Sequence, residues 1–145
     1  MSNVGTVQTL VAIRAAQAEA ARLEALTEAE RKHAAEQEEL QSVEARGAAL
    51  DMWSEALLSR LSHPAFVRIA SDWLLEKERE LSQARLDRAI AERRQDQAQN
   101  EAGSARAKLL AITSLCDDLT RHDASRRAEK QMSELMDLVL ARAAT

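Results

Sequence analysis

The stretch Leu61-Ser62-His63-Pro64-Ala65-Phe66 lies near the middle of the 145-residue sequence and decides the fold. Proline has no N–H and disrupts a helix from within, but it is favoured in the first turn of a helix. Ser62 or His63, directly before Pro64, can cap a helix that begins there. We therefore predict that the chain reverses its direction here, with Ser62, Pro64 and Phe66 at the turn.

The composition on both sides of this turn favours helix. Ala and Leu supply most of the apolar residues, Glu, Arg and Gln supply most of the polar ones, and only three Gly and one Pro interrupt the chain. These common residues lose little side-chain freedom in a helix. The sequence predicts an all-α fold: a single elongated antiparallel two-helix coiled-coil hairpin. Its arms run from about 6 to 61 and from about 66 to 143, on either side of a turn at about 62–65. They are of comparable length, each about 80 Å or more if its helix is continuous.

Three positions are candidate helix breaks within the arms. Gly47 and Gly103 carry no side chain, and glycine in a helix interior costs about 1 kcal/mol relative to alanine. Asp123 can cap a terminal helix. We expect the long helices to bend or break near these residues if they do so at all.

Large apolar residues gather at the two chain ends and around the turn. The first group recurs at spacings of three and four, which places its members on one helical face: Val7, Leu10, Ile13, Ala16, Ala20 and Leu23. A second stripe near the other end contains Met132, Leu135, Met136 and Val139. A turn at Pro64 would bring these two terminal stripes together. Trp53, Phe66 and Trp73 flank the turn, where they would either hold the hairpin's end together or anchor a partner.

The charge of the chain is negative overall but unevenly spread. The formal net charge is −4, which argues against nucleic acid as a partner. Acidic residues outnumber basic ones ten to four between Glu19 and Glu55, whereas the far C-terminus is locally basic. The acidic arm would attract a more basic neighbour, or the charges would simply form a solvated surface of mixed sign. Pairs four residues apart, such as Glu28 with Lys32, would support the polar part of the first helix.

Residues that could carry out catalysis or bind a metal are sparse. Glu30-x-x-His33 occurs once, whereas di-iron bundles need two such pairs. Cys116 and His122 are six residues apart, which does not place them on one helical face. We expect no catalytic residue, no metal and no cofactor, and hence no enzyme. With a single cysteine, no apolar run of about 18 residues and no signal-peptide pattern at the start, we expect a cytoplasmic protein that does not insert into membranes.

Two short stretches resemble a known family. Thr9-Leu10 followed by Ala20-Ala21-Arg22-Leu23 is similar to the opening helix of the FliJ/YscO family, the small stalk proteins of flagellar and injectisome type III secretion. The run from Arg126 to Glu134, Arg-Arg-Ala-Glu-Lys-Gln-Met-Ser-Glu, is similar to the C-terminal run of that family. The length and the layout of two long helices around one turn also resemble it.

The resemblance implies a non-enzymatic central stalk. Members of this family are antiparallel two-helix coiled coils that insert their paired termini into a hexameric secretion ATPase and link it to an export gate protein. Some members also bind secretion chaperones. The chain would then be cytoplasmic and peripheral to the inner-membrane export apparatus. The residues expected at the ATPase end are Leu10, Arg14, Arg22, Arg126, Arg127, Lys130, Met132 and Met136. The alternative is a free-standing coiled-coil scaffold or helical export chaperone that associates with itself.

Overall fold

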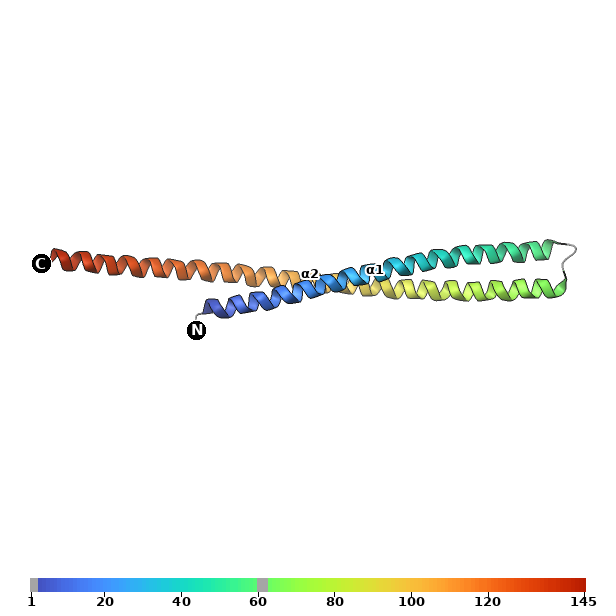
Figure 1. Cartoon of the computed structure of the whole chain (residues 1–145), viewed down its shortest axis with the longest axis horizontal. Coiled ribbons are helices and arrows are strands. Elements are labelled where there is room, and N and C mark those ends of the chain that lie inside the picture. Colours follow the sequence, from blue (N-terminus) through green and yellow to red (C-terminus); the bar gives the residue numbers. More distant parts are fainter. Residues whose placement is uncertain (1–2, 60–62) are drawn as a thin grey trace. The chain divides into compact units, whose positions relative to one another are not determined.

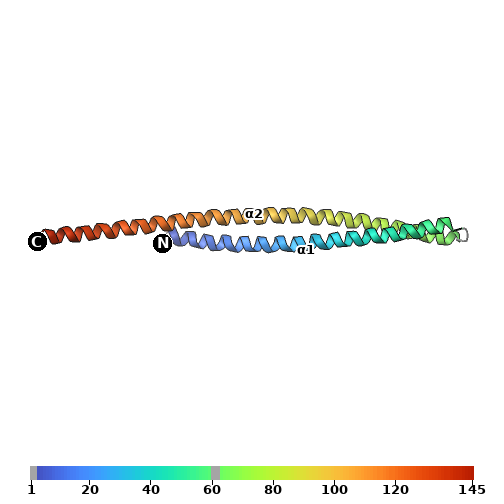
Figure 2. The same ribbon diagram turned by 90° about the horizontal axis from the view of Figure 1, so that it is seen from above.

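The computed structural model describes residues 3–59 and 63–145, which form two helices and no strand. Helix α1 spans Asn3–Leu58 (56 residues) and helix α2 spans Pro64–Ala143 (80 residues). The chain divides into two compact units, which we call the turn unit, Arg22–Asn100, and the end unit, Met1–Ala21 with Glu101–Thr145. Within each unit the two helices lie side by side and run in opposite directions (Figures 1 and 2). The all-α hairpin predicted from the sequence is confirmed.

The turn region shows how α2 begins. Pro64 is the first residue of α2, where its missing N–H costs nothing. The N–H of Ala65 donates to His63 Nδ1 at 3.1 Å, and the N–H of Phe66 donates to the His63 carbonyl oxygen at 2.9 Å. His63 is therefore the N-cap of α2. Ser62, the other candidate cap, lies outside the described residues.

Neither helix is broken at the three candidate positions. Gly47 lies within α1, and Gly103 and Asp123 lie within α2, each in continuous helical backbone. A Cβ atom added at either glycine would meet nothing within 4 Å, so no close packing requires a glycine there. The long runs of strong helix formers around each position outweigh the local cost of about 1 kcal/mol.

The seam of the turn unit is made mainly of small residues. Its buried apolar side chains are those of Ala49, Ala56, Ala70, Leu81, Ala84 and Ala98. The covered positions recur at alternating spacings of three and four, the heptad pattern of a coiled coil, and alanine there lets the two helices approach closely. Most of the large aliphatic side chains lie outside this seam, among them Leu26, Leu40, Leu50, Leu86 and Ile90.

In the end unit, too, the seam leaves out large apolar residues, including some of the stripe predicted from the sequence. Val7 is half-buried as expected, but Leu10 and Ile13 are 42% and 48% exposed, and the seam continues through Val11 and Ala18 instead. The prediction that Leu10 and Ile13 belong to the helix–helix contact is therefore wrong. A strict repeat of seven selects Val4, Val11 and Ala18, so the seam follows the regular spacing rather than the largest side chains.

Ion pairs cross the seam of the turn unit. Glu39, whose side chain is mostly covered, contacts Arg88 Nη1 at 3.2 Å and Arg85 Nε at 3.9 Å, and Arg46 pairs with Glu78 at 3.6 Å. The hydrogen bond from Arg88 to Glu39, followed by the attraction of its charge, raises the pKa of Arg88 above its ordinary value. These pairs fix which residues of α1 and α2 stand opposite each other.

The expected pair of Glu28 with Lys32 does not form. Glu28 Oε1 instead accepts a hydrogen bond from Arg31 Nη1 at 2.6 Å, and Lys32 lies 4.0 Å from Glu36. Glu28 is turned into the seam and buried, which takes its carboxylate away from the outer surface where an exposed pair with Lys32 was expected.

Candidate partner-binding surfaces

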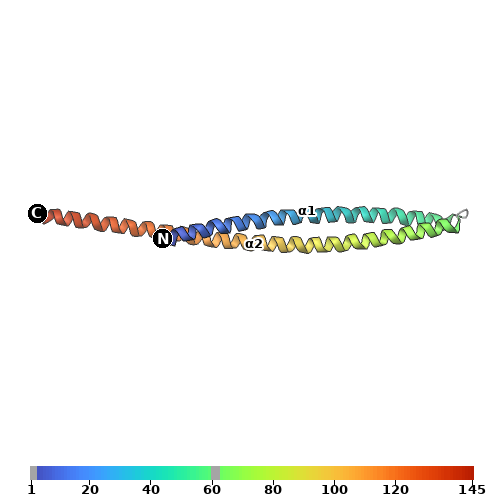
Figure 3. The same cartoon turned by 60° about the horizontal axis from the view of Figure 1, so that its bottom comes forward.

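The last part of α2 is not covered by α1 within the end unit. On α1 the covered positions begin at Val4, and on α2 they end at Asp123. Every residue from 124 to 143 is exposed, and we call this segment the C-terminal overhang. Figure 3 shows α2 continuing beyond the start of α1 in this unit. The overhang is therefore the longest stretch of the described chain that offers both faces of a helix to a partner.

The sequence of the overhang explains why the seam stops. Continuing the alternating spacing of three and four beyond Asp123 leads first to four polar residues, Arg126, Lys130, Ser133 and Asp137, and only then to Leu140. The other large apolar residues of the overhang lie elsewhere on the helix: Met132, Leu135, Met136 and Val139, with Leu138 beside them. Lys130 Nζ lies 4.0 Å from Glu134 Oε1 on the polar side. The overhang is thus amphipathic, and its apolar side is not the side that packs on α1.

The structure does not bring all the predicted ATPase-end residues together. Arg126, Arg127, Lys130, Met132 and Met136 share the overhang and are exposed. Leu10 and Arg14 lie in the same unit on α1 but alongside the part of α2 that precedes Asp123, because Val4 already stands level with Asp123. Arg14 is half-buried in the seam, with Nη1 donating to Gln17 Oε1 at 3.1 Å. Arg22 belongs to the turn unit.

The pairing of the two terminal stripes is therefore corrected. Met132 and Val139 were expected beside Leu10 and Ile13, but they lie in the overhang, where α1 does not cover them. The cause is the unequal length of the helices, 56 residues against 80, where arms of comparable length were expected. An antiparallel pair that is aligned at the turn leaves the longer helix uncovered at its far end.

A small apolar groove lies next to the turn. It has a volume of about 200 Å³ and is lined by Met52, Phe66, Ile69, Ala70 and Trp73. Phe66 and Ile69 are nevertheless largely exposed, while Trp73 is half-buried. Phe66, predicted as a turn residue, takes part in this groove. Met52 was not singled out from the sequence, because its place in the groove depends on contacts between the two helices.

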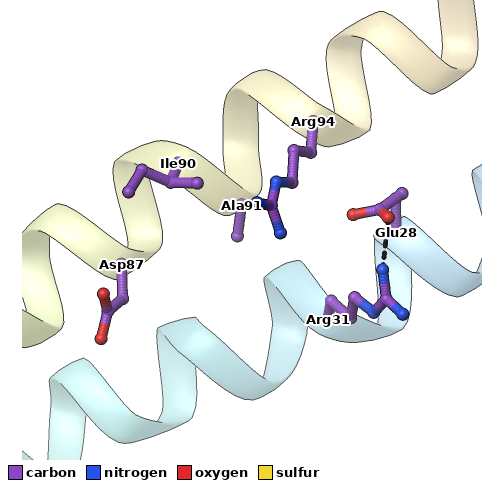
Figure 4. A pocket seen from close by; sticks show the side chains of 6 residues that line it. All are labelled: Glu28, Arg31, Asp87, Ile90, Ala91 and Arg94. Carbon is purple, nitrogen blue, oxygen red and sulfur yellow. Dashed lines mark hydrogen bonds and ion pairs between the residues drawn. The ribbon is translucent and has the colours of Figure 1, made fainter.

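A polar groove of about 270 Å³ in the turn unit was not predicted. Figure 4 shows its lining: Glu28 and Arg31 from α1, and Asp87, Ile90, Ala91 and Arg94 from α2. Glu28 is 7% exposed, and its Oε2 is buried without a hydrogen-bond partner among the described residues. Its burial follows from the heptad spacing, since Glu28 occupies a seam position between Ala21 and Ala35.

No cluster of metal-ligating side chains occurs in the described part of the chain. Nowhere in residues 3–59 and 63–145 do three or more His, Cys, Asp or Glu side chains gather so that they could hold a metal ion. Cys116 is a half-buried free thiol at a seam position of α2. A search of these same residues for a helix that is both long enough and apolar enough to span a bilayer found none.

The chain was compared with protein families, with curated proteins and with solved structures, and none of the three comparisons found a match.

Proposed function

We propose that the chain is the non-enzymatic central stalk of a type III secretion export apparatus, flagellar or injectisome, which couples a hexameric secretion ATPase to an export gate protein. The proposal starts from the resemblance of two short stretches to the FliJ/YscO family. It is supported by the pair of long antiparallel helices and by the residues that the C-terminal stretch places on an exposed helix. In this proposal the protein works in the cytoplasm beside the inner membrane, with secretion chaperones as further partners.

The observation that carries the proposal is the C-terminal overhang. A single helix is about 10–12 Å wide with its side chains, and it enters a narrow central pore more readily than a helix pair does. Met132 and Met136 offer flexible apolar contacts, and Arg126, Arg127 and Lys130 offer positive charge on the other side. We therefore propose that the overhang alone, rather than the paired termini, enters the ATPase ring.

The test adds the purified chain to the export ATPase encoded beside its gene and measures binding and ATP hydrolysis. The wild-type chain is expected to co-purify with the hexamer and to accelerate hydrolysis. Replacing Met132→Asp together with Met136→Asp should abolish both effects. The control Leu75→Asp, at a similarly exposed leucine of the turn unit, should retain them. The proposal would be abandoned if the wild-type chain neither bound nor stimulated the enzyme.

A further inference from the structure

The apolar stripe of the overhang points away from the seam. At about 100° per residue, Ala128, Met132, Leu135, Met136, Val139 and Ala143 fall within an arc of about 100° on the helix. The positions that would continue the seam, Arg126, Lys130, Ser133, Asp137 and Leu140, lie about 90–170° from the centre of this arc. An extension of α1 along the seam would therefore leave most of the stripe uncovered.

The order of residues along the stripe is symmetric about its centre. Reading inward from both ends, Ala128 corresponds to Ala143, Met132 to Val139 and Leu135 to Met136. Each pair joins residues of comparable size, with the small ones outside and the large ones inside. An interface with twofold symmetry requires such self-complementarity, because the same patch serves both copies.

We propose that this stripe, residues 128–143, binds the same stripe of a second copy of the chain in antiparallel orientation. Met132 of one copy then packs on Val139 of the other, and Leu135 packs on Met136 at the centre. The overlap begins beyond Asp123, the last residue of α2 that α1 covers, so the α1 helices of the two copies do not collide. The intramolecular seam stays intact in each copy.

The charges of the overhang select the antiparallel orientation. Arg126, Arg127 and Lys130 all lie in its first third. A parallel pair would place these three cations of both copies at the same level, where like charges repel. An antiparallel pair separates the two groups to opposite ends of the overlap. Opposing helix dipoles favour the same orientation.

Sedimentation equilibrium of the full chain over a range of concentrations tests the pairing. The wild-type chain is expected to reach a dimer. Leu135→Glu places a charge at the centre of the stripe and should raise the dimer dissociation constant at least about a hundredfold, because each dimer contains the substitution twice. Leu138→Glu is the matched control: Leu138 is 64% exposed against 59% for Leu135, but it lies off the stripe, so its dimer should persist.

Cysteine crosslinking in a Cys116→Ser background tests the orientation. The Ala128→Cys chain should form a disulfide with the Ala143→Cys chain when the two are mixed, and neither should crosslink efficiently with itself. A monomer at every concentration would overturn the proposal and assign the stripe to a different protein. Equal effects of Leu135→Glu and Leu138→Glu would also overturn it, as would self-crosslinking of the Ala128→Cys chain.

This inference does not depend on the stalk proposal, and the measurements use the purified chain without an ATPase. If both proposals hold, the second copy and the ring compete for the same apolar stripe. Addition of the ATPase would then dissociate the dimer. The Leu138→Glu chain, in which the stripe is intact, would be expected to dimerise like the wild type. Failure of dimerisation leaves ATPase stimulation untouched, so the two proposals fail separately.

Discussion

Replacing Leu81 with alanine should destabilise the hairpin through loss of the one large aliphatic side chain that is buried in the described seam. Leu81 is 4% exposed, whereas the other buried apolar residues of the described chain are alanines. Burial of a leucine side chain contributes about 1.5–3 kcal/mol, and leucine-to-alanine changes in well-packed cores cost about 2–5 kcal/mol. In a seam between two helices the neighbouring side chains can move into the space, so we expect the lower end, about 2 kcal/mol.

Thermal unfolding followed by circular dichroism at the helical band measures this loss. For a chain of this size, 2 kcal/mol corresponds to a fall in Tm of about 4–8 °C. The matched control is Leu86→Ala on the same helix, where the leucine is 60% exposed. It should change Tm by no more than about 1–2 °C, because little buried area is lost and alanine is the better helix former. Equal losses in the two variants would refute the assignment of the seam to the face of Leu81.

Four further substitutions test the seam and the helices. Glu28→Met removes the buried carboxylate whose Oε2 has no partner in the described residues, and should raise the free energy of unfolding in urea by about 1 kcal/mol; a fall of that size would mean that Oε2 is bound. Gly47→Ala and Gly103→Ala should each stabilise the helices by about 0.5–1 kcal/mol, since both sites are open to a Cβ, and a lower Tm in either variant would indicate a close contact there. Glu39→Gln should lower Tm slightly in dilute buffer because its cross-helix ion pairs are lost; this difference should shrink in about 1 M salt, and a difference independent of salt would contradict an electrostatic origin.

The sequence was sufficient to predict the fold because its signals are local. A chain rich in helix formers, with one proline preceded by a capping residue, has few alternatives to two helices around a turn. Pro64 and His63 occupy the positions that their chemistry predicts, at N1 and at the N-cap of α2. Local propensity does not, however, determine how two helices are aligned with each other.

The face that each helix buries was predicted less well, because the largest apolar residues are not the ones at the regular spacing of the seam. Leu10 and Ile13 are large but exposed, whereas the covered positions of α1 include Val11 and Ala18 and continue through charged residues such as Lys32, Glu39 and Arg46. Glu28 was expected on the surface because the stretch around it has almost no large apolar side chains, whereas the repeat places it in the seam. With charged residues at several covered positions, apolar spacing alone does not identify the buried face.

The candidate partner-binding residues were predicted as one group, and the structure does not bring all of them together. Met132 and Met136 are exposed as a partner surface requires, and the unequal lengths of α1 and α2 determine that Leu10 and Arg14 do not lie beside them. The predicted arms, about 6–61 and 66–143, are already unequal, so the overhang could have been anticipated from the sequence. The groove that contains Met52 depends on contacts between the two helices, which no local pattern reveals.

The position of Glu39 between Arg85 and Arg88 also penalises misalignment of the two helices. If α2 slid along α1 by seven residues in one direction, the apolar pattern would be repeated but Glu39 would face Glu92 and Gln95. Slippage of seven residues in the other direction would place it against Glu78 and Leu81. Either error exchanges attraction for repulsion at a mostly covered carboxylate, so Glu39 favours the observed alignment of an alanine-rich seam over these two alternatives.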